Sequence, residues 1–200
     1  QLDFYTGQPA VALTRYARLL AEGPDSAHLR LERGRTLLAL GRATEAEQDL
    51  AHALTADPSL SDAYLALSKL ALAASDVPAA RRNSDLALAL AESGETLFQA
   101  GQVAEARGET SAAVATYEAA FERAVNPAPT EPDRYATEVA RRRPLPLTYL
   151  PCLIQLYPDP LLTAITQAQA RLLEQQGQLD RAAELYDRLR RYVPAPASQP

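Results

Sequence analysis

The chain has 200 residues, of which 47% are hydrophobic and 22% charged, a balance typical of a folded globular protein rather than a disordered or fibrous one. Its formal net charge of -5 disfavours nucleic acid as a partner, because binding to phosphates depends on clustered Lys and Arg. No stretch reaches the roughly 18 consecutive apolar residues of a membrane-spanning helix, and the single cysteine, Cys152, excludes an internal disulfide.

Residue usage points to an all-α chain. Ala and Leu dominate, Trp is absent, and Ile154 and Ile165 are the only isoleucines, so residues that favour strands are scarce. Met is also absent, even at position 1, which indicates that Gln1 is not a translation start. Because a signal peptide, a lipid anchor or another domain could precede it, the sequence leaves the location open between cytoplasm and cell envelope.

Along the chain, five small residues recur at a nearly fixed spacing, and each stands five residues before an alanine. The small residues are Gly7, Gly41, Ser75, Gly108 and Gly177, and the alanines are Ala12, Ala46, Ala80, Ala113 and Ala182. The first three small residues are 34 residues apart, and the fourth follows after 33. A glycine between two helices allows the positive φ of a tight turn, and an alanine lets two helices approach closely. The pattern predicts a series of helical hairpins.

The predicted helices can be placed from their start and stop signals. In chain order they span about 9–22, 27–40, 44–56, 61–74, 77–91, 94–107, 110–125, 161–176 and 179–192, with no sheet. Thr44 and Glu47 have the spacing of a capping box, and Asp76 is an N-cap candidate ahead of Pro78.

This pattern resembles the tetratricopeptide repeat, a 34-residue helix-turn-helix unit of many bacterial proteins that stacks into a right-handed superhelix. The second unit matches most fully, with Gly34, Leu37, Gly41, Ala46, Leu50, Ala53 and Pro58 at the small, apolar and breaker positions of the family. Arg30 and Arg33 depart from it, since they stand where apolar residues are usual. The resemblance implies an all-α solenoid. Its single array over 1–192 comprises a partial repeat 1–26 and repeats 27–60, 61–93, 94–127 and 163–192, and a proline-rich tail follows at 193–200.

One stretch breaks the period. Gly108 and Gly177 are 69 residues apart, close to two periods, so we expect a degenerate, proline-rich repeat at 128–160. Its helices would lie at about 132–143 and 148–157, separated by a turn at the prolines between them.

Catalytic and cofactor motifs are missing from the sequence. It contains no phosphate-binding loop, no zinc-protease HExxH motif and no GxSxG nucleophile motif. His28 and His52 lack a second ligand or an orienting carboxylate nearby, and Cys152 lies in an apolar run without a neighbouring cation. We therefore expect no enzyme activity, no metal site and no cofactor.

In proteins with these repeats, the first helix of each unit lines a concave groove through repeat positions 2, 5, 9 and 12. The resemblance therefore implies a peptide-binding groove made of Phe4, Leu31, Arg35, Leu38, Leu65, Lys69, Leu72, Phe98 and Gln102. The shortage of Lys and Asn disfavours binding of a terminal carboxylate, whereas apolar residues with polar margins suit an amphipathic helix or an extended apolar peptide. Alternatively, the leucines pack against an adjoining helix, since apolar residues at helical spacing are usually core.

The leading functional hypothesis is a non-enzymatic scaffold that holds a protein or peptide partner, in a bacterial envelope or appendage assembly. The alternative is the sensor or oligomerisation region of a larger regulator or enzyme. Neither end of the array has a polar capping helix, so we expect that the chain either self-associates through an end or has its front face covered by a segment upstream of Gln1.

Overall fold

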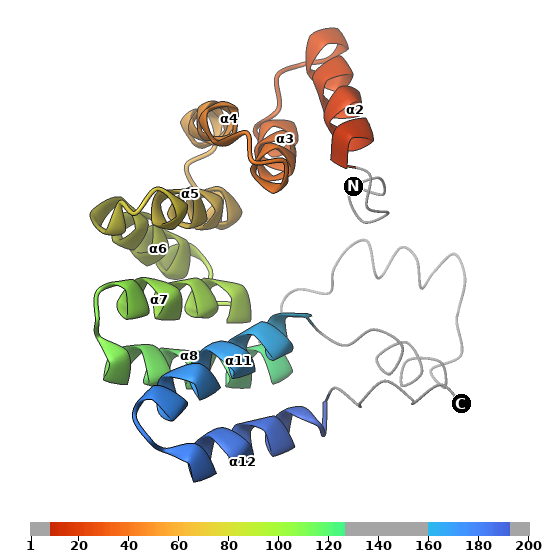
Figure 1. Cartoon of the computed structure of the whole chain (residues 1–200). Coiled ribbons are helices and arrows are strands. Elements are labelled where there is room, and N and C mark those ends of the chain that lie inside the picture. Colours follow the sequence, from red (N-terminus) through yellow and green to blue (C-terminus); the bar gives the residue numbers. More distant parts are fainter. Residues whose placement is uncertain (1–8, 127–159, 193–200) are drawn as a thin grey trace, which may run out of the picture. The chain divides into compact units, whose positions relative to one another are not determined.

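The computed structural model describes residues 9–126 and 160–192, and these form α-helices joined by short turns, without a strand among them (Figure 1). The chain divides into two compact units. Unit 1 comprises residues 1–92 with 102–108, and unit 2 comprises 93–101 with 109–200. Helix α7 (Gly94–Ala106) contributes residues to both units. The predicted class, an all-α solenoid of helical hairpins, is confirmed.

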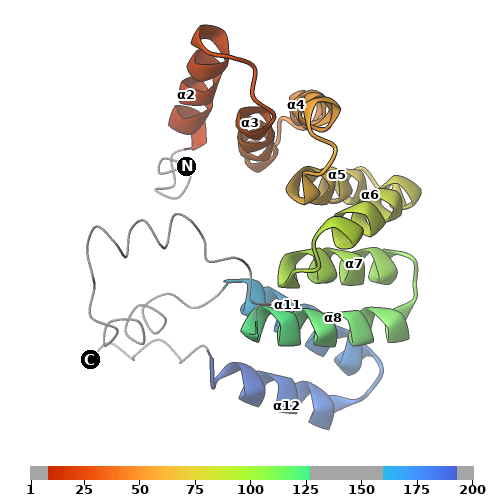
Figure 2. The ribbon, with the colours of Figure 1, turned by 180° about the vertical axis from the view of Figure 1, so that it is seen from behind.

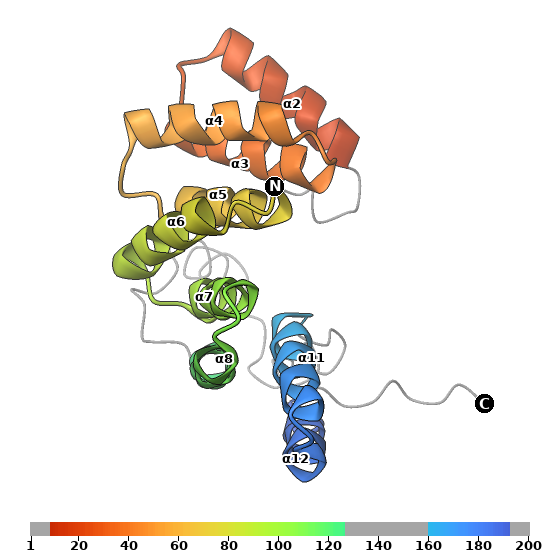
Figure 3. The same ribbon diagram turned by 60° about the vertical axis from the view of Figure 1, so that its left-hand side comes forward.

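The described part of unit 1 comprises five helices besides the end of α7. They are α2 (Pro9–Glu22), α3 (Ala27–Ala39), α4 (Ala43–Ala56), α5 (Ser61–Ala73) and α6 (Val77–Leu90). Each helix contacts the next, and α3 also contacts α5 (Figure 3). Leu31, Leu50, Ala53, Ala63 and Ala66 form a buried cluster where α3, α4 and α5 meet. The first hairpin is thus packed against the first helix of the second.

Unit 2 contains the start of α7 together with α8 (Thr110–Val125), α11 (Pro160–Gln175) and α12 (Leu179–Leu189). Helix α11 packs directly on α8 and also on α12 (Figure 2). Four buried residues of α11 and α12 join these helices, and Val114 of α8 packs against them; the four are Ala170, Leu173, Ala182 and Leu185. Helix α11 therefore follows α8 in the stack as α5 follows α4.

The degenerate repeat expected at 128–160 lies outside the described residues, apart from Pro160, which begins α11. The expected helices at 132–143 and 148–157 lie there too.

The turns inside the hairpins share one geometry. Gly41, Gly108 and Gly177 have φ values of 73°, 75° and 74°, and Ser75 has a φ of 61°. The amide that follows the turn residue donates to a carbonyl five residues earlier in three of these turns, as Arg42 N does to Leu37 O at 2.9 Å. This is the helix-ending motif that favours glycine, because a side chain at positive φ crowds the backbone. The periodic small residue is therefore a turn residue, as predicted.

The two helices of each hairpin cross at a pair of residues whose sizes compensate. A Cβ added to Gly101 would collide with Cε1 of the fully buried Tyr117 ring, and one added to Gly34 would lie 3.0 Å from Leu50 Cγ. The same repeat positions in α5 and α6 hold Ser68 and the buried Ser84. A larger residue on the second helix thus accompanies glycine on the first.

The predicted helix ends agree with the structure to one residue, with one exception. The last helix ends at Leu189 instead of 192, because Arg191 N and Tyr192 N donate to carbonyls three residues earlier in a tighter turn. Asp76 caps α6 by accepting from Ala79 N at 2.9 Å, as predicted. The capping box at Thr44 is wrong, since α4 begins at Ala43 without a side-chain cap.

Candidate partner-binding site

A hollow of about 200 Å³ opens between α3 and α5 in unit 1, and we call it the α3–α5 hollow. Its lining residues are Arg35, Leu38, Asp62, Leu65, Ala66 and Lys69. Leu65 and Ala66 are buried at its floor, Leu38 is half-buried, and the exposed Asp62 and Lys69 are at its rim. The site thus combines an apolar floor with a charged rim.

The charges at the rim differ in how they are paired. The Arg35 guanidinium lies 3.3 Å from an Asp62 carboxylate oxygen and 3.6 Å from one of Glu32. Lys69 makes no ion pair or hydrogen bond within the described ranges 9–126 and 160–192. Among the charged groups that line the hollow, its ammonium group is therefore the unpaired one.

The structure brings together four of the predicted groove residues, namely Arg35, Leu38, Leu65 and Lys69. Their positions one turn apart on α3 and α5 put them on one face of each helix, which explains why they meet where these helices lie against each other. Asp62 and Ala66 complete the hollow. Asp62 is at repeat position 2, as His28 is in the preceding repeat. Its charge is opposite to that of Arg35, which was a signal in the sequence for the Arg35–Asp62 ion pair.

The structure corrects the prediction that Leu31 lines the groove. Its side chain is only 2% exposed and packs with Leu50 and Ala53 of α4 and with Ala63 of α5. Leu72 is likewise partly buried, against the cluster of Ala71, Ala80 and Val103. For these two leucines the structure favours the alternative that they pack against neighbouring helices.

The remaining groove candidates fall elsewhere. Phe98 is half-buried in unit 2, with its ring centroid 5.6 Å from that of Tyr117. Gln102 is half-buried in the part of α7 that belongs to unit 1. Phe4 lies outside the described residues.

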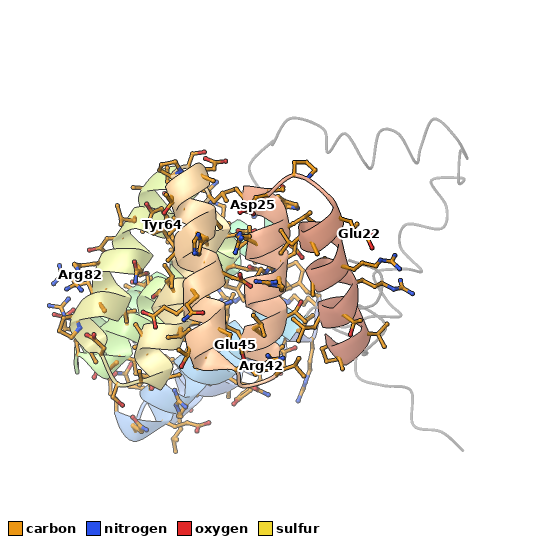
Figure 4. All side chains as sticks on the ribbon, turned by 90° about the horizontal axis from the view of Figure 1, so that it is seen from above. Glu22, Asp25, Arg42, Glu45, Tyr64 and Arg82 are labelled. Atoms are coloured by element: carbon orange, nitrogen blue, oxygen red, sulfur yellow. The ribbon has the colours of Figure 1, made fainter. Side chains whose placement is uncertain are left out.

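A second hollow in unit 1, about 430 Å³, lies among α2, α3 and α4, and we call it the α2–α4 hollow. Leu13, Ala17 and Leu37 contribute apolar surface to it, and Arg33, Arg42, Glu45 and Asp49 contribute charge. Arg42 donates to Glu45 at 2.7 and 2.6 Å, and these hydrogen bonds lower the pKa of the Glu45 carboxyl. Figure 4 shows this pair at one end of α3 and α4, and Asp25 at the other end.

Arg33 forms an ion pair in the same hollow with Asp49, whose side chain is only 3% exposed. Arg33 donates to both carboxylate oxygens of Asp49 at 2.5 Å, and Arg30 adds a bond of 3.3 Å to one of them. Arg30 also donates to both oxygens of Asp25, which lowers the pKa of that carboxyl. The two arginines that depart from the repeat pattern thus compensate a buried aspartate.

The α8–α11 junction of unit 2 holds a related polar network. Gln169, at the repeat position of Arg33, donates to Glu118 Oε2 at 2.9 Å. Arg188 of α12 donates to both oxygens of Glu118, and its guanidinium carbon lies 4.0 Å from the Phe121 ring centroid. The hydrogen bonds from Arg188 and then Gln169 lower the pKa of Glu118, while burial opposes them. This network joins α12 and α11 to α8.

The described part of the chain offers neither a cluster of metal ligands nor a membrane-spanning helix. Within residues 9–126 and 160–192, no group of three or more His, Cys, Asp or Glu is placed to hold a metal ion. His52 is exposed and His28 is also exposed. None of the helices described is long and apolar enough to cross a membrane. Cys152 lies outside these residues.

Comparison with known proteins gives one family. The family model described as tetratricopeptide repeat matches residues 1–61. A thermophilic tetratricopeptide-repeat protein of Thermus thermophilus is 20% identical and superimposes with a TM-score of 0.68 over 96% of this chain and 86% of that one. MamA is 18% identical, with a TM-score of 0.60 over 95% of this chain and 91% of that one. No curated protein matches the sequence.

A tetratricopeptide-repeat protein of Parabacteroides merdae is also similar, at 14% identity with a TM-score of 0.64 over 96% of this chain and 62% of that one. At such identities the likeness concerns the fold. Helical hairpins stacked through a recurring turn define a helical-repeat solenoid. Residues 1–61 match the tetratricopeptide-repeat family, and the chain shares the fold of solved proteins with these repeats.

Proposed function

We propose that the chain is a non-catalytic scaffold that holds a segment of a partner protein in the α3–α5 hollow. The carrying observation is that this hollow has an apolar lining between the first helices of two neighbouring repeats, formed by the half-buried Leu38 and by Leu65 and Ala66, which are each 5% exposed. Repeat proteins of this family generally serve as protein-binding scaffolds, which supports a protein partner in the coarse sense. The α2–α4 hollow suits a partner less, because Arg33, Arg42, Glu45 and Asp49 are already paired with one another.

The proposal needs a test that locates the contact as well as detecting it. A photo-reactive phenylalanine analogue in place of Leu38 should cross-link one partner in a lysate of the source cells, and mass spectrometry identifies that protein. The same analogue in place of Glu47, which is exposed on α4 outside both hollows, is the matched control.

The identified partner is then purified, and its affinity for the chain is measured by calorimetry. We expect Leu38→Asp to weaken binding at least about tenfold while circular dichroism still reports a folded helical chain. Equal cross-linking from positions 38 and 47, or unchanged affinity in the Leu38→Asp variant, would contradict the proposal.

Two finer expectations remain predictions. One is the role in an envelope or appendage assembly, and the other is self-association through an end of the array. The exposed Leu179, Tyr186 and Tyr192 of unit 2 are compatible with an apolar contact there. Sedimentation of the chain at several concentrations tests it, with Leu179→Glu expected to shift any oligomer towards monomer.

A further inference from the structure

The α3–α5 hollow has features that specify the chemistry of its partner beyond an apolar surface. Its volume of about 200 Å³ is below the range of about 300 to 1,000 Å³ typical of sites for cofactors and other small molecules. Leu38, Leu65 and Ala66 leave room on its floor for one apolar side chain. The hollow is thus of a size to receive a single anchoring residue from a larger partner.

Charge at the rim adds a second requirement. The Arg35 guanidinium is paired with Asp62 and Glu32, at 3.3 and 3.6 Å. Lys69 is exposed and has no ionic partner in the described part of the chain. The four rim charges sum to zero, but a segment seated in the hollow meets the unpaired ammonium group of Lys69 at the edge of its apolar anchor.

We infer that the hollow selects an acidic partner segment, in which one apolar side chain fills the floor and a nearby Asp or Glu side chain pairs with Lys69. This inference rests on the proposed function, because it names the partner chemistry of the same site. A lysine ammonium on its flexible stem can pair with a carboxylate at several positions, so the spacing between the apolar anchor and the acidic residue is only loosely fixed. Such complementarity serves specificity more than raw affinity.

Selection from short random peptides displayed on phage tests the inference. The peptides are fused to the coat protein through their carboxyl ends, so that only side-chain carboxylates are offered, and the full chain is the immobilised target. We expect the enriched peptides to combine an apolar residue with Asp or Glu a few positions away. Synthesised as free peptides with blocked ends, they should bind the Lys69→Glu variant about tenfold more weakly than the original chain.

Arg82→Glu is the matched control, because it makes the same change of charge at an exposed arginine of α6, away from the hollow (Figure 4). It should leave both the selected sequences and their affinities unchanged. Selection with Lys69→Glu should instead favour Lys or Arg beside the apolar anchor.

The possible outcomes separate the two proposals. The inference is overturned if the enriched peptides lack acidic residues or bind the Lys69→Glu variant as tightly as the original chain. The scaffold function still stands in that case if Leu38→Asp abolishes their binding. An equal loss of affinity in the Lys69→Glu and Arg82→Glu variants also overturns it, since that would reflect net charge alone. Failure to enrich any peptide against the original chain counts against a peptide-binding hollow altogether.

Discussion

Units 1 and 2 both join their helices through a polar network, but the residues of the two networks differ. In unit 1 the buried Asp49 holds Arg33 and Arg30, so its network ties α3 to α4 within one hairpin. In unit 2 the partly exposed Glu118 accepts hydrogen bonds from Gln169 and Arg188, so its network joins the α11–α12 hairpin to α8. One repeat position on the first helix, occupied by Arg33 or Gln169, thus serves two different joints.

The comparison teaches that departures from the repeat pattern come in compensating sets. Arg33 is matched by Asp49, and the bulky Tyr117 is matched by Gly101. Charges satisfied in this way hold the repeats together and have little left to offer a ligand. Lys69, which has no such match among the described residues, is for that reason the charge we assign to partner binding.

Breaking the buried network of unit 1 should have the largest effect. Asp49→Asn leaves Arg33, about three-quarters buried, without a carboxylate, while Arg30 keeps Asp25, and we expect a loss of about 2 to 3 kcal/mol in the free energy of unfolding. Urea denaturation followed by circular dichroism measures it. Glu45→Gln is the control, since it breaks an exposed pair and should have a far smaller effect. Equal losses in the two variants would contradict the contrast between buried and exposed pairs.

The helix crossings differ in how tightly they are filled. Gly101→Ala places a Cβ against the fully buried Tyr117 ring, so we expect a loss of about 2 kcal/mol in stability. Gly34→Ala in unit 1 meets the more adaptable Leu50 side chain and gains helix propensity, so its effect should be close to zero. Thermal unfolding of both variants compares the crossings. A Gly101→Ala variant as stable as the original chain would show that the Tyr117 crossing can relax.

A smaller effect distinguishes the turns of the two units. Ser75 adopts a positive φ that Gly177 provides in unit 2 without strain. Ser75→Gly should therefore stabilise the chain by about 0.5 to 1 kcal/mol, the relief of strain minus the greater freedom of glycine in the unfolded chain. The reverse change, Gly41→Ser, should destabilise it by a similar amount. Opposite signs in thermal unfolding confirm this, and a destabilising Ser75→Gly would refute it.

The smallest effect concerns pH and the network of unit 2. Because the pKa of Glu118 is lowered in the folded chain, its contribution is present above the usual carboxyl pKa and is lost as the pH falls through the folded value. Glu118→Gln should therefore reduce the drop in stability on acidification, and cost about 0.5 kcal/mol at neutral pH, where solvent screens the pair. Denaturation at several pH values checks it. A variant with the original pH profile would rule out this contribution.

The sequence predicted backbone features better than side-chain partners. Gly41 and Asp76 act where they were expected, because a positive φ and a helix start depend on local chemistry. The pairing of Arg33 with Asp49 joins two helices, and spacing alone does not determine which acid an arginine reaches. Arg42 pairs with Glu45 at the start of α4, where the expected cap by Thr44 does not form.

The sequence predicted only some residues of the candidate site, because contacts between helices also decide which residues line it. Helical periodicity placed Arg35, Leu38, Leu65 and Lys69 on the right faces of their helices. It could not tell Leu65, which lines a hollow, from Leu31, which α4 and α5 cover almost completely. Burial depends on the neighbouring repeats, and a single helix does not encode it.

The most direct test of partner binding by unit 1 is an amide NMR titration of the isotopically labelled chain with a peptide selected as described above. The account predicts that chemical shift changes concentrate in α3 and α5 around Arg35, Leu38 and Lys69. It also predicts that Lys69→Glu reduces them while Arg82→Glu does not. Changes centred on α8, α11 and α12 of unit 2, or on the α2–α4 hollow, would contradict it.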